Sequence, residues 1–348
     1  MAKLLLKMLL AGCIVFFMLN VITYYYYSPP QKVLNAVQTT DFILEKNYTG
    51  YIMDEGMAKF STDENGYNND LSVDKNNIDI LIMGSSHTLA YNVNRDENYA
   101  SILHEKLKND SELNDCSEVY NIGMWGHIWY ALANDFNNAY RTYHPSKYVI
   151  MEIHDYLGFS IESLDEIINN EYPREGFANS KLLDTLRLFP YIQLAMHQMN
   201  NILIQNRSEG KTSKTSVVEL NENDYKEYEK KLDEIIVNIN KLLQDSHCKL
   251  ILLYQPHLVL NKDGTANVVK LKDDYVSVFK DVCSRNNVIF CDMSIEFINY
   301  YNKNHQLPHG FLNTAVGEGH LNKYGHRIIG EELYRIIKED QKAEVAVK

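Results

Sequence analysis

Ile80-Leu81-Ile82-Met83-Gly84-Ser85-Ser86-His87 is the stretch of sequence that decides the fold. Four apolar residues run directly into a glycine, two serines and a histidine, which is typical of a buried parallel strand that ends in a tight turn. In open α/β folds, ligands and nucleophiles gather at the carboxyl edge of the sheet. A serine hydroxyl becomes reactive there when a base takes its proton and backbone donors receive the oxyanion. A candidate base, His320, lies near the C-terminus in the segment 319–325.

Further segments of the same kind predict the fold class. Short apolar runs rich in β-branched and aromatic residues are expected to be strands; they are residues 78–83, 119–122, 148–153, 249–254 and 288–292. Helical patterns lie at 99–107, 130–143, 224–243 and 274–284, and a last helix from Lys323 places Ile329, Leu333, Ile336 and Ile337 on one face. Alternating strands and helices predict a three-layer α/β/α sandwich with a mainly parallel sheet.

The N-terminus predicts a membrane anchor. Residues 8–27 carry no charge, and an apolar run of about 20 residues is long enough to span a bilayer. Lys3 and Lys7 precede this run, and Tyr24 to Tyr27 form an aromatic belt at its other end. Because lysines favour the cytoplasmic side, we expect a single-pass signal anchor in the cell membrane, with a cytoplasmic N-terminus and an extracytoplasmic domain.

Two other interpretations of the N-terminus stay open. Leu10-Ala11-Gly12-Cys13 matches a lipoprotein cleavage signal, and a cleaved secretory signal has a similar composition. However, the apolar stretch continues well past Cys13, and only residues 4–9 would form the apolar core before the cleavage site. The uncleaved anchor is therefore favoured.

Charge and cysteine content exclude other classes of protein. The net charge is −12, with 46 acidic and 34 basic residues, which argues against nucleic acid as a partner. Four cysteines lie outside the anchor, and their spacing fits no zinc pattern. A disulfide between Cys283 and Cys291 is permitted outside the cytoplasm, although a buried thiol in an apolar strand is favoured for Cys291.

The expected domain organisation has three parts. Residues 1–27 form the anchor, 28–77 a polar stalk or small cap, and 78–340 the α/β domain. Residues 156–222 interrupt the strand–helix alternation and are expected to be an insertion. Such an insertion at the carboxyl edge of a strand is either a lid over the site or an inert surface excursion.

The chain resembles the SGNH/GDSL hydrolases through four short blocks in the expected order. Gly84-Ser85-Ser86 matches the first block, with Ser86 as the nucleophile and Ser85 in place of the usual aspartate. This Gly-Ser-Ser form is similar to that of membrane-associated branches, including cell-envelope acyltransferases and D-alanyl transfer proteins. The block Asn121 to Gly126 implies that the backbone N–H of Gly126 is an oxyanion donor; otherwise it is a turn after a strand.

The third and fourth blocks depart from the family pattern. Gly-x-Asn-Asp aligns with Glu152-Ile153-His154-Asp155, so His154 replaces the asparagine, either as an oxyanion donor or as a structural histidine. His320 matches the catalytic histidine, but the family's acid position is Gly317. We expect Glu318 to be the acid, as in the alginate-type O-acetyltransferases; the alternatives are a Ser–His dyad or an acid borrowed from elsewhere in the chain.

The resemblance implies acyl-ester chemistry with no metal or organic cofactor. We expect an esterase or O-acyltransferase that acts on an acyl, and preferentially acetyl, ester of a cell-envelope or exported glycan. Its partners would be that substrate, the membrane and, for transfer, a membrane protein that donates the acyl group. The alternatives are a D-alanyl or other acyl-transfer factor and a non-catalytic glycan-binding relative.

Overall fold

The computed structural model describes most of the chain. The residues outside the description are 1, 28–29, 31, 35–41, 70–72, 75, 128, 155–160, 170–188, 193, 197, 200–221, 245, 270–274 and 348. Most of the predicted insertion at 156–222 is therefore outside the described residues.

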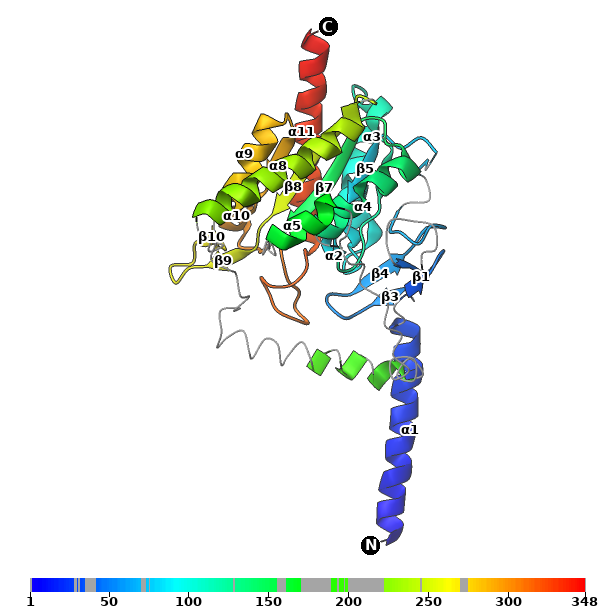
Figure 1. The fold of residues 1–348 in the computed structure, drawn as a ribbon. Helices are drawn as coiled ribbons and strands as arrows, with labels where there is room; N and C mark the ends of the chain where they lie inside the picture. Colours follow the sequence, from blue (N-terminus) through cyan, green and yellow to red (C-terminus); the bar gives the residue numbers. More distant parts are fainter. Residues whose placement is uncertain are drawn as a thin grey trace.

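A five-stranded parallel sheet forms the centre of the molecule (Figure 1). Its order is β11-β8-β7-β5-β6, and its strands are β5 (Ile80–Met83), β6 (Val119–Asn121), β7 (Tyr148–His154), β8 (Lys249–Gln255) and β11 (Ile289–Asp292). Every pair of neighbouring strands is parallel. Each predicted strand is present, with its ends within two residues of the expected positions.

Alternate residues of these strands enter two separate apolar cores, one on each face of the sheet. In β5, Leu81 and Met83 face the first core, whereas Ile80 and Ile82 face the second. Helices α4 (Trp129–Tyr143), α5 (Ile161–Ile168), α8 (Glu222–Gln244) and α9 (Tyr275–Arg285) cover the first core. Helices α3 (Tyr99–Lys108), α10 (Ser294–Asn304) and α11 (Lys323–Val347) cover the second. The predicted three-layer α/β/α class is thus confirmed, and α10 is a helix that the sequence patterns did not predict.

Residues 190–192, 194–196 and 198–199 are helical, and other short elements lie around the layers. They are helix α2 (Ser86–Leu89), the 3₁₀ turns Arg95–Glu97 and Asn114–Cys116, and three antiparallel pairs: β1 (Lys32–Leu34) with β2 (Phe42–Leu44), β3 (Thr49–Ile52) with β4 (Ala58–Ser61), and β9 (Leu258–Leu260) with β10 (Ala266–Val268). Ile52, Phe60 and Tyr67 are buried in the first core. The N-terminal hairpin β3–β4 is therefore packed on the α/β domain.

Helix α1 (Ala2–Tyr26) is long and apolar enough to cross a membrane. Its apolar side chains are largely exposed, and it projects away from the α/β domain (Figure 1), although Phe16 contacts the rings of Phe189 and Tyr191. Its end meets the β3–β4 hairpin, where the rings of Tyr26 and Tyr51 lie 6.4 Å apart. A helix of this kind fits the predicted anchor.

All five cysteines are free. Cys283 belongs to the core on one face of the sheet and Cys291 to the core on the other face, so the permitted disulfide between them does not form. Burial raises the pKa of the Cys248 and Cys283 thiols to about 12. These thiols therefore act as small apolar core groups.

Candidate active site

Ser86 lies at the carboxyl end of the central strand β5, as the first residue of α2. Ser85 caps the helix, because its hydroxyl accepts the backbone N–H of His87 at 3.3 Å. Gly84 is required at the turn: a Cβ there would lie 1.7 Å from Oγ1 of Thr88 and 2.4 Å from Oε2 of Glu152. The turn therefore places Ser86 at the edge of the sheet. Position 84 beneath it has no room for a side chain.

His320 is placed against Ser86, as the two sequence blocks predicted. Its Nε2 lies 2.8 Å from Oγ of Ser86, a distance at which the imidazole can accept the hydroxyl proton. The carbonyl of His320 accepts the N–H of Gly310 at 2.9 Å, and the next residue, Leu321, forms a β-bridge with His309. These backbone contacts fix the position of His320 just before α11 begins.

Glu55 is the carboxylate that contacts His320. It lies in the turn between β3 and β4; its Oε2 is 2.5 Å from Nδ1 of His320, and its Oε1 accepts the backbone N–H of His320 at 2.9 Å. Its side chain is only 12% exposed, and Asn92 donates to Oε2 at 3.3 Å. A carboxylate in this position holds the imidazole in one tautomer and stabilises the imidazolium that forms during reaction.

The structure places Glu55, rather than the expected Glu318, against His320. Glu318 is exposed, and the Nδ1 atom of His320 is in contact with Glu55 instead. Gly317 and Gly319, on either side of it, have φ angles of +91° and +79°, and this left-handed backbone makes a tight turn around Glu318. A Cβ on Gly319 would lie 2.2 Å from Oε1 of Glu55. The glycine therefore leaves the space that the hairpin carboxylate fills.

A second carboxylate, Glu152 of β7, lies beneath the serine turn. It is 2% exposed. It accepts the N–H of Ser85 at 2.8 Å, the hydroxyl of Ser85 at 2.9 Å and the amide of Gln255 at 2.6 Å, and it also accepts the hydroxyl of Thr88. Because a buried carboxylate is tolerated when several donors surround it, Glu152 fixes the turn that carries the nucleophile. This function was missed from the sequence, where Glu152 was only the first position of a weak match.

Of the two predicted oxyanion donors, the structure describes the surroundings of Gly126 but not the side chain of His154. Gly126 lies in the turn after β6 with a φ of +76°, and no atom comes within 4 Å of where its Cβ would be, so there is open space beside it. The N–H of Met124 donates to the carbonyl of Gly84 at 3.0 Å, which joins this loop to the serine turn. His154 ends β7, opposite Gln255, but its side chain is outside the described residues.

Aromatic and imidazole rings surround the Ser86–His320 pair. The rings of His87 and Tyr91 lie 5.0 and 5.3 Å from that of His320, and Trp125 packs edge-on against Tyr91. Burial, followed by the nearby Glu55 carboxylate, raises the pKa of the Tyr91 phenol. Burial and the proximity of His320 lower the pKa of His326 to about 3, so His326 stays neutral. His320 is therefore surrounded by aromatic and imidazole rings, with the Glu55 carboxylate at its Nδ1 atom.

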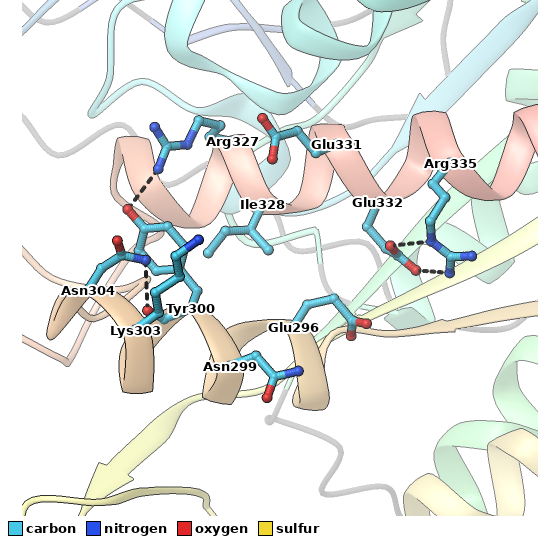
Figure 2. Close-up of a pocket in the computed structure, with 10 residues that line it drawn as sticks. All are labelled: Glu296, Asn299, Tyr300, Lys303, Asn304, Arg327, Ile328, Glu331, Glu332 and Arg335. Atoms are coloured by element: carbon cyan, nitrogen blue, oxygen red, sulfur yellow. Dashed lines mark hydrogen bonds and ion pairs between the residues drawn. The ribbon is translucent and has the colours of Figure 1, made fainter.

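A separate hollow lies between α10 and α11 (Figure 2). Arg327 donates to the hydroxyl of Tyr300 at 2.7 Å, and Arg335 pairs with Glu332. Neither Ser86 nor His320 lines it. Both of its arginines already have partners on the protein, so we place the chemistry at the sheet edge. Among the described residues, no three metal-ligating side chains come together.

Comparison with known proteins gives distant structural neighbours only. No protein-family model and no curated protein sequence matches the chain. The acetyl xylan esterase AlAXEase is 16% identical over 74% of this chain and 99% of its own, with a TM-score of 0.39. An acetylxylan esterase from Geobacillus stearothermophilus is 14% identical over 75% of this chain and 95% of its own, with a TM-score of 0.38. A candidate SGNH hydrolase from Slackia heliotrinireducens is 12% identical over 75% and 98%, with a TM-score of 0.37.

Proposed function

We propose that this chain is a membrane-anchored serine esterase or O-acyltransferase that uses Ser86, His320 and Glu55. The observation that carries the proposal is the continuous contact from Oγ of Ser86 to Nε2 of His320, and from Nδ1 of His320 to the Glu55 carboxylate. Nucleophile, base and orienting acid follow in the order that acyl transfer requires. This arrangement disfavours the non-catalytic alternative, because a binding module has no need of an activated hydroxyl.

In the first half of the reaction, Oγ of Ser86 bonds to the acyl carbon while its proton passes to Nε2 of His320. Glu55 stabilises the resulting imidazolium. The bond between the acyl carbon and the leaving oxygen then breaks, and the leaving alkoxide takes the proton from Nε2. The backbone N–H groups of Ser86 and Gly126 are the proposed donors to the oxyanion, with His154 as a further donor.

In the second half, water or an acceptor hydroxyl gives its proton to Nε2 and attacks the acyl carbon. Oγ of Ser86 leaves and recovers that proton, which regenerates the enzyme. Water gives hydrolysis, and a glycan hydroxyl gives transfer. No metal or organic cofactor is needed for any of these steps.

The substrate we propose is an acyl, preferentially acetyl, ester on a cell-envelope or exported glycan. Support comes from the Gly-Ser-Ser turn and from the N-terminal helix, in which Lys3 and Lys7 lie before the uncharged run and favour an extracytoplasmic domain. A membrane protein that supplies the acyl group would be the partner in the transfer reaction. A D-alanyl transfer factor would use the same three residues with a different acyl group.

The test is hydrolysis of p-nitrophenyl acetate by the full-length protein in detergent micelles. Ser86→Ala is expected to reduce kcat/KM by roughly a thousandfold or more, because it removes the nucleophile. Ser284→Ala, an exposed serine on α9, is the matched control and should leave kcat/KM unchanged. Equal turnover by wild type and Ser86→Ala would overturn the proposal. Adding an acetyl-accepting oligosaccharide then separates transfer from hydrolysis by the acetylated product.

A further inference from the structure

The hairpin that supplies Glu55 also receives the end of the membrane helix. Tyr27, the residue after α1, is 2% exposed, and its phenol lies near the Asp54 carboxylate. Asp54 directly precedes Glu55 in the turn. The end of α1 is therefore linked to His320 through two neighbouring residues of the turn. Asp54 lies near Tyr27, and Glu55 contacts His320.

The same hairpin is joined to the loop 310–319, which leads into His320. The N–H of Gly56 donates to Oδ1 of Asn313 at 2.7 Å, and Nδ2 of Asn313 donates to the carbonyl of Gly56 at 3.0 Å. Figure 1 shows this loop, in orange, and the β3–β4 hairpin on the side of the α/β domain from which α1 leaves. Two of the segments that border the site therefore lie toward the anchor.

Both segments expose apolar side chains. Met57 of the hairpin is 61% exposed, and Leu312 and Val316 of the loop are 97% and 61% exposed. Single exposed apolar residues are ordinary on soluble proteins. Here they lie on two hydrogen-bonded segments on the side of the domain from which α1 leaves, and the exposed Tyr24, Tyr25 and Tyr26 of α1 match the aromatic belt of a membrane interface. Apolar side chains on the side of a domain that carries a membrane helix face toward the bilayer, which is an apolar partner for them.

We propose that this end of the domain rests on the bilayer, with Met57, Leu312 and Val316 in the interface, and that Ser86 acts on esters carried at the membrane surface. The substrate class is then an acylated headgroup or an acylated glycan attached to a lipid. This extends the proposed esterase or acyltransferase function and rests on it. Contact with the bilayer would hold the ester and the site at a high effective concentration relative to one another.

The first test moves the site away from the membrane and leaves its contacts intact. A seven-residue helical spacer of Ala, Glu and Lys, inserted between Ile22 and Thr23, lifts the domain by about 10 Å and keeps nearly the same rotational setting. The spacer variant and wild type are reconstituted in phosphatidylcholine vesicles. They are assayed with soluble p-nitrophenyl acetate and with a fluorogenic acetyl ester attached to a diacylglycerol in the same vesicles.

The spacer is expected to leave turnover of the soluble ester unchanged and to reduce turnover of the vesicle-borne ester by about tenfold or more. Equal turnover of the vesicle-borne ester by the two proteins would overturn the inference. If wild type fails to hydrolyse p-nitrophenyl acetate, the proposed function fails instead, so the two failures are distinguishable.

The second test reads membrane contact without using activity. In a Cys13→Ser background, Leu312→Cys is labelled with a fluorophore that shifts to the blue in apolar surroundings. Val345→Cys, at an exposed position near the far end of α11, is the matched control. In lipid nanodiscs the label at position 312 is expected to emit at a shorter wavelength than the label at 345. The same emission at both positions would overturn the contact.

Discussion

The two regions that form the site differ in how they are built. Ser86 begins α2 at the carboxyl edge of the sheet, and His320 lies in the loop just before α11; both helices adjoin the two large cores. The β3–β4 hairpin, with four residues in each strand, places Glu55 in a turn. The hairpin is held at the site by hydrogen bonds with residues that are distant in the sequence: His320, Asn313 and Asn92. The end of a core strand therefore positions Ser86, whereas loop contacts position His320 and Glu55, the proposed base and acid.

The largest expected effect tests whether the two regions act as one unit. His320→Ala should lower kcat for p-nitrophenyl acetate by about 10²–10⁴-fold, because Ser86 loses its base. If Glu55 acts only through His320, the double variant His320→Ala/Glu55→Gln should be no slower than His320→Ala alone. A double variant that is much slower than His320→Ala would mean that Glu55 contacts the reacting groups by another route.

The next effect tests the fit of the hairpin against the base. Gly319→Ala introduces a Cβ 2.2 Å from Oε1 of Glu55, so the carboxylate must shift. We expect kcat to fall by about 10- to 100-fold, since displacements of about 1 Å at an active site have effects of this size. Gly264→Ala is the matched control: Gly264 also has a positive φ, +84°, but its Cβ would meet no atom within 4 Å. Similar loss of kcat in both variants would mean that the effect is only backbone strain.

The smallest expected effect is on the stability of the fold, and it concerns His326, a buried residue of α11. Burial and the nearby His320 lower the pKa of His326 to about 3 in the folded protein, whereas an unfolded histidine has a pKa near 6.5. Between these values the unfolded chain binds a proton that the folded chain does not, so this contribution to stability is present above pH 6.5 and is lost as pH falls toward 3. Thermal unfolding of wild type should therefore lose stability with falling pH more steeply than that of His326→Gln. Parallel pH profiles would contradict this assignment.

The parts that could be predicted from sequence have local signals. Each strand of the parallel sheet is a short apolar run, and both Ser86 and His320 lie in blocks with glycine and polar neighbours in a recognisable order. These signals identify where chain segments end at the sheet edge, and the topology of the sheet then brings such ends together. The nucleophile–base pair follows from this reasoning.

Glu55 could not be predicted in this way. It is 265 residues from His320, in a hairpin too short to show a periodic pattern, within a lead-in that was expected to be a stalk or small cap. Its position depends on tertiary contacts, including the space beside Gly319. Glu318, two residues before His320, was the nearest acid in sequence, but the glycines around it leave it exposed. Proximity along the chain was therefore a poor guide to proximity at the site.

The central claim is that the hairpin supplies the acid, and a pair of matched carboxylate variants tests it most directly. Glu55→Gln and Glu318→Gln each remove one negative charge and keep the size of the side chain. With p-nitrophenyl acetate and the full-length protein, we expect Glu55→Gln to lower kcat by about 10²–10⁴-fold, with little change in KM, because the imidazole loses its orienting carboxylate. Glu318→Gln should match wild type. A large loss in Glu318→Gln together with wild-type activity in Glu55→Gln would contradict the claim.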